Sequence, residues 1–265
     1  MHQLITSHHN PKVKSLIALE KPRERRKQCL FLIEGKKEIG LALRAGYRLG
    51  NLFFCENLIP VEEVMELGLP EKALLPVTRE VYDKIAVREN TGGVIAVAEQ
   101  KANLLSNLPL SKNPLLLVLE SVEKPGNLGA MLRTADAAGL DAVILCDPQT
   151  DLYNPNVIRS SIGCIFTMPV AAAASEETIA WLTGHNISFY GASLHASKPY
   201  YEQDFTQPSA IVMGTESKGL SDKWIRHSQG NIIIPMAGQA DSMNVSTAAA
   251  VLVFEARRQR GFPSI

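Results

Sequence analysis

Short apolar runs separated by polar, turn-forming stretches recur along the whole chain. In the first hundred residues the runs at 31–33, 52–55 and 94–97 predict strands, and 39–43 fits a helix that stops at Gly46. Asn10 followed by Pro11 predicts a helix start, because Asn caps a helix and Pro suits its first turn. Strands alternating with helices in this way indicate a small α/β domain.

A second α/β series follows a polar stretch at 99–114 that contains Pro and Asn and is typical of a linker. Several of its apolar runs are rich in Val and Ile, as buried parallel strands are. These runs lie at 115–119, 142–145, 187–190, 210–213 and 232–234. Helices are expected between them, for example at 130–138, and a last one at 246–258. We therefore expect domains at 1–100 and 114–265, joined by a linker at 101–113.

Composition bounds the class of protein without deciding it. Apolar residues make up 46% of the 265, which is enough for a buried core, and Lys plus Arg balance Asp plus Glu at 27 each. That balance argues against a protein that holds nucleic acid by bulk charge alone, although it allows a local patch. Residues 1–30 contain such a patch, with seven basic and two acidic residues, and a solvated surface run explains it as well as phosphate binding does.

The chain contains no feature of a secreted, membrane or metal-binding protein. The N-terminus lacks the apolar core of a signal peptide, and no stretch reaches the ~18 apolar residues of a membrane span. The four cysteines are scattered, and neither they nor the six histidines show ligand spacing. We therefore expect a cytoplasmic protein with reduced core thiols, no metal and no membrane partner.

Polar residues concentrate where two of the predicted strands end, and ligands bind α/β sheets at strand ends. Asn127 lies in a loop after the strand that ends at Glu120, and Arg133 lies on the helix that follows. A tight strand-to-helix connection with a solvated Arg is the competing interpretation, and for the glycines of this segment taken alone it is the better one. The strand predicted at 210–213 runs into Gly214 and then Glu216, where a glycine could let the backbone approach a flat ligand. A surface turn is an equally good interpretation of that segment alone.

A third segment places Ser242, Asn244 and Ser246 just before and within the start of the final helix. Helix capping explains one of these polar side chains, since a single residue caps a helix. It does not explain all of them, so this segment points to a site more strongly than the other two.

Together these segments resemble the signature motifs of the SpoU, or TrmH, family of RNA 2′-O-methyltransferases, part of the SPOUT superfamily. The matching residues are Asn127-Leu128-Gly129 with Arg133, the run GTESKGL at 214–220, Ile234-Pro235-Met236, and SMNVS at 242–246. Asn154-Pro155 and RSSIG at 159–163 also match. The first domain resembles the family's substrate-binding domain more weakly, through FLIEG at 31–35 and GVIAV at 93–97. Met243 stands where the family usually has Leu, a residue of similar volume.

The resemblance implies an α/β SPOUT fold with a trefoil knot near the C-terminus, preceded by a smaller α/β RNA-binding domain. It implies S-adenosylmethionine bound in the knot and an active site formed between the subunits of a homodimer. Its cofactor-binding positions are Ala192, Ser193, Gly214, Ile234 and Met243, contacting largely through backbone atoms. Its polar catalytic positions are Asn127, Arg133, Glu216, Ser242 and Asn244. The RNA contacts we expect are Arg23, Arg25, Arg26, Lys27 and Arg159.

Arg133 is the central residue of the implied reaction, and we expect it to face the loops of the second and third motifs. The family proposal makes this arginine the general base, yet a guanidinium stays protonated in proteins. A clamp on the RNA phosphate or on the forming alkoxide is physically easier. Asn127, Ser242 and Asn244 would orient cofactor and ribose, and Glu216 would anchor the loop.

Several alternatives remain open. A class I methyltransferase or a dinucleotide enzyme needs a complete GxGxxG fingerprint, of which Gly126 and Gly129 are only a part. A non-catalytic RNA-binding protein of the same fold should lack Arg133, Ser242 and Asn244, which are all present. The RNA is expected to be 23S ribosomal RNA, with transfer RNA as the alternative.

Overall fold

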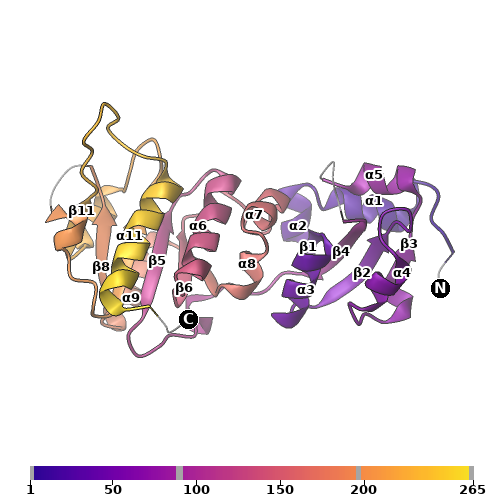
Figure 1. Ribbon diagram of the computed structural model, residues 1–265, viewed down its shortest axis with the longest axis horizontal. Helices are drawn as coiled ribbons and strands as arrows, with labels where there is room; N and C mark the ends of the chain where they lie inside the picture. The colour runs from indigo at the N-terminus through magenta and orange to yellow at the C-terminus, as the bar shows by residue number, and fades with distance from the viewer. Residues whose placement is uncertain (1–2, 88–91, 195–197, 263–265) are drawn as a thin grey trace. The chain divides into compact units, whose positions relative to one another are not determined.

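The computed structural model describes residues 3–87, 92–194 and 198–262, and the chain divides into two compact units (Figure 1). Unit 1 contains the residues up to Ala102 together with Asp151–Thr167, and unit 2 contains Asn103–Thr150 and the chain from Met168 onward. The sequence placed residues 151–167 in the second domain, whereas the structure packs them into unit 1. The chain therefore passes between the units three times, after Ala102, Thr150 and Thr167.

In the described part of unit 1, a mixed sheet has the strand order β1-β4-β2-β3. Its strands are β1 Leu30–Glu34, β2 Leu49–Phe54, β3 Leu74–Pro76 and β4 Val94–Glu99. The helices are α1 Pro11–Ala18, α2 Pro22–Gln28, α3 Lys36–Arg44, α4 Val61–Met65 and α5 Arg79–Ile85, with a 3-10 turn at Glu71–Ala73. β4 pairs antiparallel with β1 and β2, while β2 and β3 are parallel.

Local sequence signals explain where several of these elements begin. Asn10 caps α1 as expected, because its side-chain oxygen accepts from the backbone N–H of Lys12 at 2.9 Å. The basic run, which the sequence left without an element, forms α2. Thr78 caps α5 through Val81, a helix that the sequence did not predict.

The segment 151–167 contributes α7 Pro155–Ser160 and α8 Cys164–Thr167 to unit 1. Phe31 of β1 packs against Tyr153 with ring centroids 4.3 Å apart and stacks on Phe166 at 6.1 Å. Gly163, between the two helices, has φ +80° and lies so close to Leu41 that an added Cβ would meet its Cδ1 at 2.7 Å. The segment is therefore part of the apolar core of unit 1.

In the described part of unit 2, all strands run parallel in the order β7-β6-β5-β10-β8-β11-β9. The strands are β5 Leu115–Glu120, β6 Ala142–Cys146, β7 Val170–Ala173, β8 Ser188–Ala192, β9 Lys198–Pro199, β10 Ser209–Met213 and β11 Gly230–Ile233. The helices are α6 Pro125–Ala137, α9 Ser175–Gly184, α10 Asp222–His227 and α11 Val245–Arg260, with 3-10 turns at Leu105–Asn107 and Tyr200–Glu202. This parallel sheet confirms the α/β class expected from the sequence.

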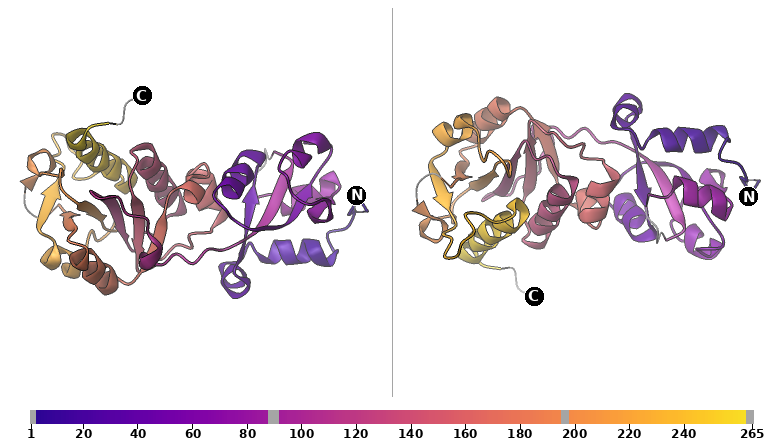
Figure 2. Two further views of the ribbon diagram at one scale, coloured as in Figure 1. Left: turned by 90° about the horizontal axis from the view of Figure 1, so that it is seen from below. Right: turned by 90° about the horizontal axis from the view of Figure 1, so that it is seen from above.

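Helices cover both faces of the sheet in unit 2. α6 and α11 lie side by side on one face, and α9 and α10 lie on the other (Figure 2). Both faces of the central strands are therefore apolar, and every residue of β5 and β10 is buried. Leu105, inside the predicted linker, packs into this core, so part of the linker belongs to unit 2. Within the described ranges, no helix combines the length and apolar character needed to span a bilayer.

The assignment of 151–167 to unit 1 predicts a selective effect of Gly163→Ala. An alanine there must adopt positive φ and displace Leu41, which costs about 1–2 kcal/mol or more. We expect hydrogen–deuterium exchange to show lost protection in β1 and β4, while β5 and β10 keep theirs. Gly184→Ala is the control, because a Cβ at this position of α9 meets nothing within 4 Å. Equal loss of protection in both units would contradict the assignment.

Candidate functional site

The candidate site lies where the carboxyl ends of β5, β10, β8 and β11 are neighbours in the sheet. Chain order reverses between β5 and β10: β6 and β7 continue to one side of β5, and β8 and β11 lie beyond β10. Such a reversal leaves a crevice beyond the strand ends, which is the common binding place in parallel sheets. The motif segments predicted from the sequence all follow these strands.

The segment 214–219, which we call the site loop, turns back on itself directly after β10. Thr215 and Gly219 exchange two backbone hydrogen bonds of 3.0 Å, and the Thr215 hydroxyl accepts from the backbone N–H of Lys218 at 3.0 Å. Gly219 has φ +67°, which favours glycine. The loop is therefore a closed turn that presents Glu216 at a defined position.

Gly214 is required by this turn itself. A Cβ at Gly214 would overlap the backbone carbonyl of Gly219 and the backbone nitrogen of Leu220. From the sequence we expected the space beside Gly214 to be occupied by a ligand. In the structure the backbone of Gly219 and Leu220 occupies it. A larger residue at 214 would thus disrupt the loop as well as any ligand contact.

Glu216 is the centre of a polar cluster that joins all three motif segments. Its Oε2 pairs with the Nζ of Lys124, and its Oε1 accepts from the Nδ2 of Asn127 at 2.5 Å and of Asn244 at 3.0 Å. The Asn244 amide also donates to the Oδ1 of Asn127 at 3.2 Å. The structure therefore brings together Asn127, Glu216 and Asn244, as the resemblance implied.

The cluster holds Glu216 in its charged form. The hydrogen bond from Lys124, and after it the one from Asn127, lowers the pKa of the Glu216 carboxyl. Because the folded-state pKa is lowered, this contribution to stability is present above the ordinary carboxyl pKa and is lost as pH falls through the lowered one. Glu216 is thus an anion at neutral pH and does not act as a proton donor there.

Two members of the cluster lie at helix starts, and for Asn244 helix capping was the competing explanation. Asn244 is the N-cap of α11, and its Oδ1 accepts from the backbone N–H of Ser246 at 3.0 Å. Its amide nitrogen remains available for Glu216, so one side chain serves both purposes. Asn127 lies within the first turn of α6, which begins at Pro125, and so belongs to a helix instead of the loop expected.

The carboxylate of Glu120 anchors the chain just after the site loop. Glu120 ends β5 with 7% of its surface exposed, and it accepts from the Ser221 backbone N–H at 2.8 Å and the Ser221 hydroxyl at 2.6 Å. Ser221 precedes α10. Glu120 therefore fixes the chain where it leaves the site loop, while Glu216 ties the loop itself to the starts of α6 and α11.

A cavity of about 270 Å³ opens beside the site loop, far more than the roughly 10–15 Å³ that one water needs. All of the predicted cofactor-binding residues line it: Ala192, Ser193, Gly214, Ile234 and Met243. The sequence missed other lining residues, among them Leu194, Thr215, Leu220, Ile232, Met236 and Leu252. Most of these are apolar residues at strand ends, which no local pattern distinguishes from core.

Lys124 is the polar residue that sequence reasoning missed in the cluster. It stands immediately before Pro125, three positions ahead of Asn127. That adjacency was the available signal, yet a lysine before a helix is usually only solvated. Glu216 gives this one a partner, although its side chain is 67% exposed.

Two predicted catalytic residues lie apart from the cluster. Ser242 lines the cavity and donates to the Oδ1 of Asp241 at 3.0 Å. Arg133 is exposed on α6, about 120° around the helix from Asn127. Among the described residues, no hydrogen bond or ion pair joins Arg133 to the cluster. Its expected place facing the loops of the second and third motifs therefore stays a prediction.

The predicted RNA contacts lie in unit 1 and divide into two groups. Arg23, Arg26, Lys27 and Arg159 are exposed. Arg25 is 1% exposed and pairs with Asp151, so its prediction as a phosphate contact is wrong. From the sequence alone we treated the basic residues at 23–27 alike. In the fold, Arg25 is buried and the others are exposed.

Comparison with known proteins matches both units. The SpoU rRNA methylase family matches residues 114–254, and the MRM3-like substrate binding domain matches residues 10–96. The 23S rRNA (guanosine(2553)-2'-O)-methyltransferase RlmP of Bacillus subtilis is 33% identical over 254 residues, which cover 96% of this chain and 98% of that protein. The 23S rRNA (guanosine-2'-O-)-methyltransferase RlmB of Haemophilus influenzae is 39% identical over 191 residues, covering 69% and 78%.

Solved structures give the same result for the fold. A crystal structure of an RNA 2'-O ribose methyltransferase aligns with TM-score 0.85 and 42% identity, covering 97% of this chain and 99% of that one. An AdoMet-bound rRNA methyltransferase from Sinorhizobium meliloti aligns with TM-score 0.89 and 31% identity, covering 97% of both chains.

The cavity lies where the strand order of the parallel sheet reverses, and a charged amide–carboxylate cluster lies beside it. These features define a ligand-binding α/β protein with the site of an enzyme. The full-length matches then identify its family. The chain belongs to the SpoU rRNA methylase family, which confirms the resemblance seen in its motifs.

The ion pair at the cluster predicts how Glu216 titrates. Replacing Lys124 by Met removes the strongest donor, so the pKa of the Glu216 carboxyl should rise toward its ordinary value. NMR titration of the carboxyl carbon measures this shift. Lys218→Met is the control, since it removes an exposed lysine of the same loop whose side chain has no recorded partner among the described residues. Equal pKa values for Glu216 in wild type and Lys124→Met would refute the role of the pair.

Proposed function

We propose that this protein transfers a methyl group from S-adenosylmethionine to a ribose 2′-hydroxyl of 23S ribosomal RNA. The observation that carries the proposal is that the cavity and the amide–carboxylate cluster share the site loop. Relatives over nearly the whole chain are 23S rRNA 2'-O-methyltransferases, and similar structures have been solved with AdoMet bound.

The residues around the cavity fit S-adenosylmethionine in their chemistry. Ile232, Met236 and Leu252 provide apolar surface for a flat heterocycle, and the strand ends provide backbone donors and acceptors for polar groups. Glu216 also lines the cavity, and its lowered pKa keeps a negative charge there. That charge suits a sulfonium, which supplies an electrophilic methyl when the cofactor is bound.

The residues of the cluster act by position and charge. Asn127 and Asn244 hold Glu216 and with it the site loop, so the geometry beside the cavity is set before substrate arrives. Ser242, at the cavity wall, orients the cofactor end and the ribose. Glu216 does not take the hydroxyl proton, because a carboxyl of lowered pKa is a weak base. The proton leaves through water or phosphate.

Arg133 completes the site from a second subunit. Its exposed place on α6, with no hydrogen bond or ion pair to the cluster among the described residues, supports a composite site between two copies. As a fixed cation with a planar fork, it clamps the RNA phosphate or the forming alkoxide. Val251 and Phe254 of the neighbouring α11 supply apolar surface for the contact, since Phe254 is 39% exposed. Leu252 of the same helix is 1% exposed and lines the cavity instead of adding to this surface.

Three further features belong to the same proposal. Unit 1 binds the RNA, which the match to a substrate-binding domain supports. The enzyme works in the cytoplasm, consistent with relatives that act on ribosomal RNA. The C-terminal segments form the family's trefoil knot, a prediction that strand order alone does not test.

The function is tested by mapping ribose methylation across total RNA in cells with and without the protein. We expect a site in 23S rRNA to lose its methyl group in the deletion strain and regain it with the wild-type gene. Ala192→Leu fills the cavity, so it should abolish cofactor binding in the purified protein and fail to restore the methyl group. Ala174→Leu, at an exposed position, is the control that should restore it. Loss of a tRNA methylation alone would move the substrate to tRNA.

The composite site is tested by mixing two inactive proteins. Arg133→Ala should bind cofactor normally but transfer no methyl, whereas Ala192→Leu should bind no cofactor. In a mixed dimer, the intact cavity of the first subunit meets the intact Arg133 of the second, so one working site forms. We expect activity on co-refolding, measured as methyl transfer to 23S rRNA. A mixture as inactive as its parents, in dimers shown to be mixed, would place Arg133 and the cavity in one chain.

A further inference from the structure

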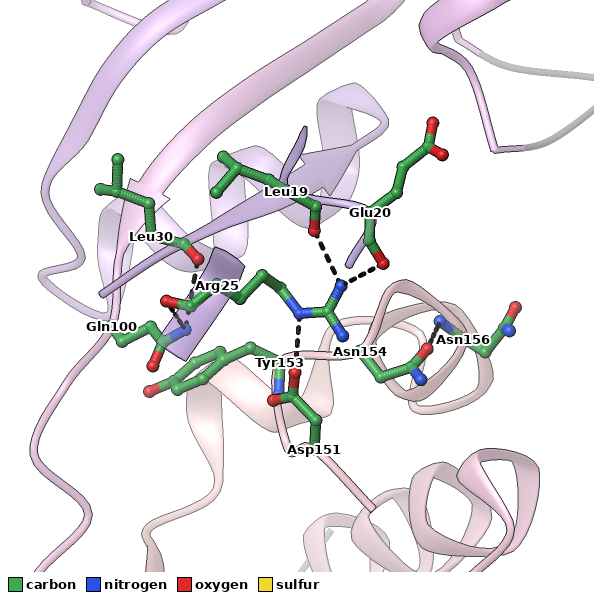
Figure 3. Close-up of polar contacts among 9 residues, drawn as sticks. All are labelled: Leu19, Glu20, Arg25, Leu30, Gln100, Asp151, Tyr153, Asn154 and Asn156. Carbon is green, nitrogen blue, oxygen red and sulfur yellow. Dashed lines mark hydrogen bonds and ion pairs between the residues drawn. The ribbon is translucent and has the colours of Figure 1, made fainter. Parts of the chain in front are cut away.

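Helix α2 is attached to unit 1 by a charge instead of an apolar face. Its sequence is PRERRKQ, and Arg25 is its buried residue (Figure 3). A helix without apolar side chains gains almost nothing from the hydrophobic effect on docking. Its place in the fold must therefore come from the contacts of Arg25 and of the backbone.

Arg25 uses its guanidinium to join three parts of unit 1. Its Nε donates to the Oδ2 of Asp151 at 2.7 Å, and its Nη1 donates to the backbone oxygens of Leu19 and Glu20, each at 2.8 Å. Both carbonyls belong to the turn between α1 and α2. The guanidinium thus closes the turn that precedes its own helix and fastens it to the segment 151–167.

Asp151 is itself held in place for this contact. Its Oδ1 accepts from the backbone N–H of Tyr153 at 3.0 Å, which leaves Oδ2 for Arg25. The Tyr153 hydroxyl accepts from the backbone N–H of Lys101 at 3.0 Å, and its ring packs on Phe31. Asp151 is therefore a fixed acceptor on a rigid segment.

Removing this acceptor would leave a cation buried without its countercharge. A buried ion pair contributes little net stability, but breaking it by deleting one partner is strongly unfavourable. With 1% of Arg25 exposed, the cheapest response is for α2 to undock so that the guanidinium reaches water. The docked state of α2 therefore depends on Asp151.

Docking of Arg25 gives α2 an outward basic face. Arg23, Arg26 and Lys27 are exposed and lie at positions i, i+3 and i+4, which share one side of a helix. Among the described residues, none of these side chains takes part in a hydrogen bond or ion pair. Such free cations at fixed spacing suit the phosphates of a nucleic-acid backbone.

We propose that Asp151 is a positioning residue for RNA binding: by holding Arg25 inside unit 1, it presents Arg23, Arg26 and Lys27 together to RNA phosphates. The proposal rests on the RNA-binding function proposed for unit 1. It assigns to Asp151, the half-buried acid of the pair, a role that net charge would not predict, because an acid near RNA normally weakens binding.

The sign of the effect of Asp151→Ala separates the two views. Removing a negative charge strengthens RNA binding if only net charge matters. If Asp151 positions α2, affinity for in vitro transcribed 23S rRNA should instead fall by about tenfold. The slope of log affinity against log salt concentration should become shallower, as expected for the loss of up to about two to three phosphate contacts. Filter binding at several salt concentrations measures both. Cofactor affinity, a property of unit 2, should stay unchanged.

Asp83→Ala is the matched control, because it removes an acid from an exposed Arg–Asp pair on α5 of the same unit. It should leave RNA affinity unchanged or slightly raised. Asp151→Asn makes the same charge change while keeping a side-chain oxygen, so a smaller loss in the same direction is expected. That variant decides the question if Asp151→Ala does not fold. Arg25→Lys, which keeps the charge but loses the planar fork, should also bind RNA less tightly.

A double-mutant cycle completes the test. The triple variant Arg23→Gln/Arg26→Gln/Lys27→Gln should itself lose RNA affinity, and adding Asp151→Ala should then have no further effect, since both act through the same face. If Asp151→Ala binds RNA as tightly as Asp83→Ala does, or adds its full loss to the triple variant, the positioning role is overturned. If the triple variant binds like wild type, the proposed RNA-binding face of α2 fails instead.

Discussion

The carboxylate of Glu216 is the point on which the geometry of unit 2 at its site depends. Its donors lie 92, 89 and 28 positions away in the chain, on Lys124, Asn127 and Asn244. Lys124 and Asn244 precede α6 and α11, and Asn127 lies in the first turn of α6, so the carboxylate ties the starts of both helices to the loop after β10. That loop also lines the cavity, so a change in the polar cluster changes the shape of the cavity as well.

In unit 1 an ion pair with a buried arginine likewise joins segments that are distant in sequence. Arg25 and Asp151 lie 126 positions apart and join the N-terminal helices to a segment that interrupts the sheet of unit 2 in sequence. Thr150, the residue before Asp151, donates its hydroxyl to the carbonyl of Glu123, next to Lys124. Two consecutive residues therefore make separate contacts: Thr150 bonds to the loop before α6, and Asp151 holds α2.

Much of the fold was predictable because strands and caps are encoded locally. The apolar runs near 31–33, 115–119 and 210–213 all form strands, since burial on both faces demands continuous apolar sequence. Asn10 caps its helix as its position indicates. The motif segments pointed to the right strand ends, and the lining of the cavity includes every residue assigned to the cofactor, because parallel strands bring their carboxyl ends to one edge.

The sequence by itself determined most of the strands, the class of fold and the family, since each follows from neighbouring residues or ordered motifs. Tertiary structure alone decided what each polar residue does. It buried Arg25 among exposed basic neighbours, moved 151–167 into unit 1, left Arg133 exposed on α6 and gave Lys124 a partner. It also showed that Gly214 makes room for Gly219. The reason is physical: the free energy of a charged or backbone group depends on which partner reaches it, and those partners are distant in sequence.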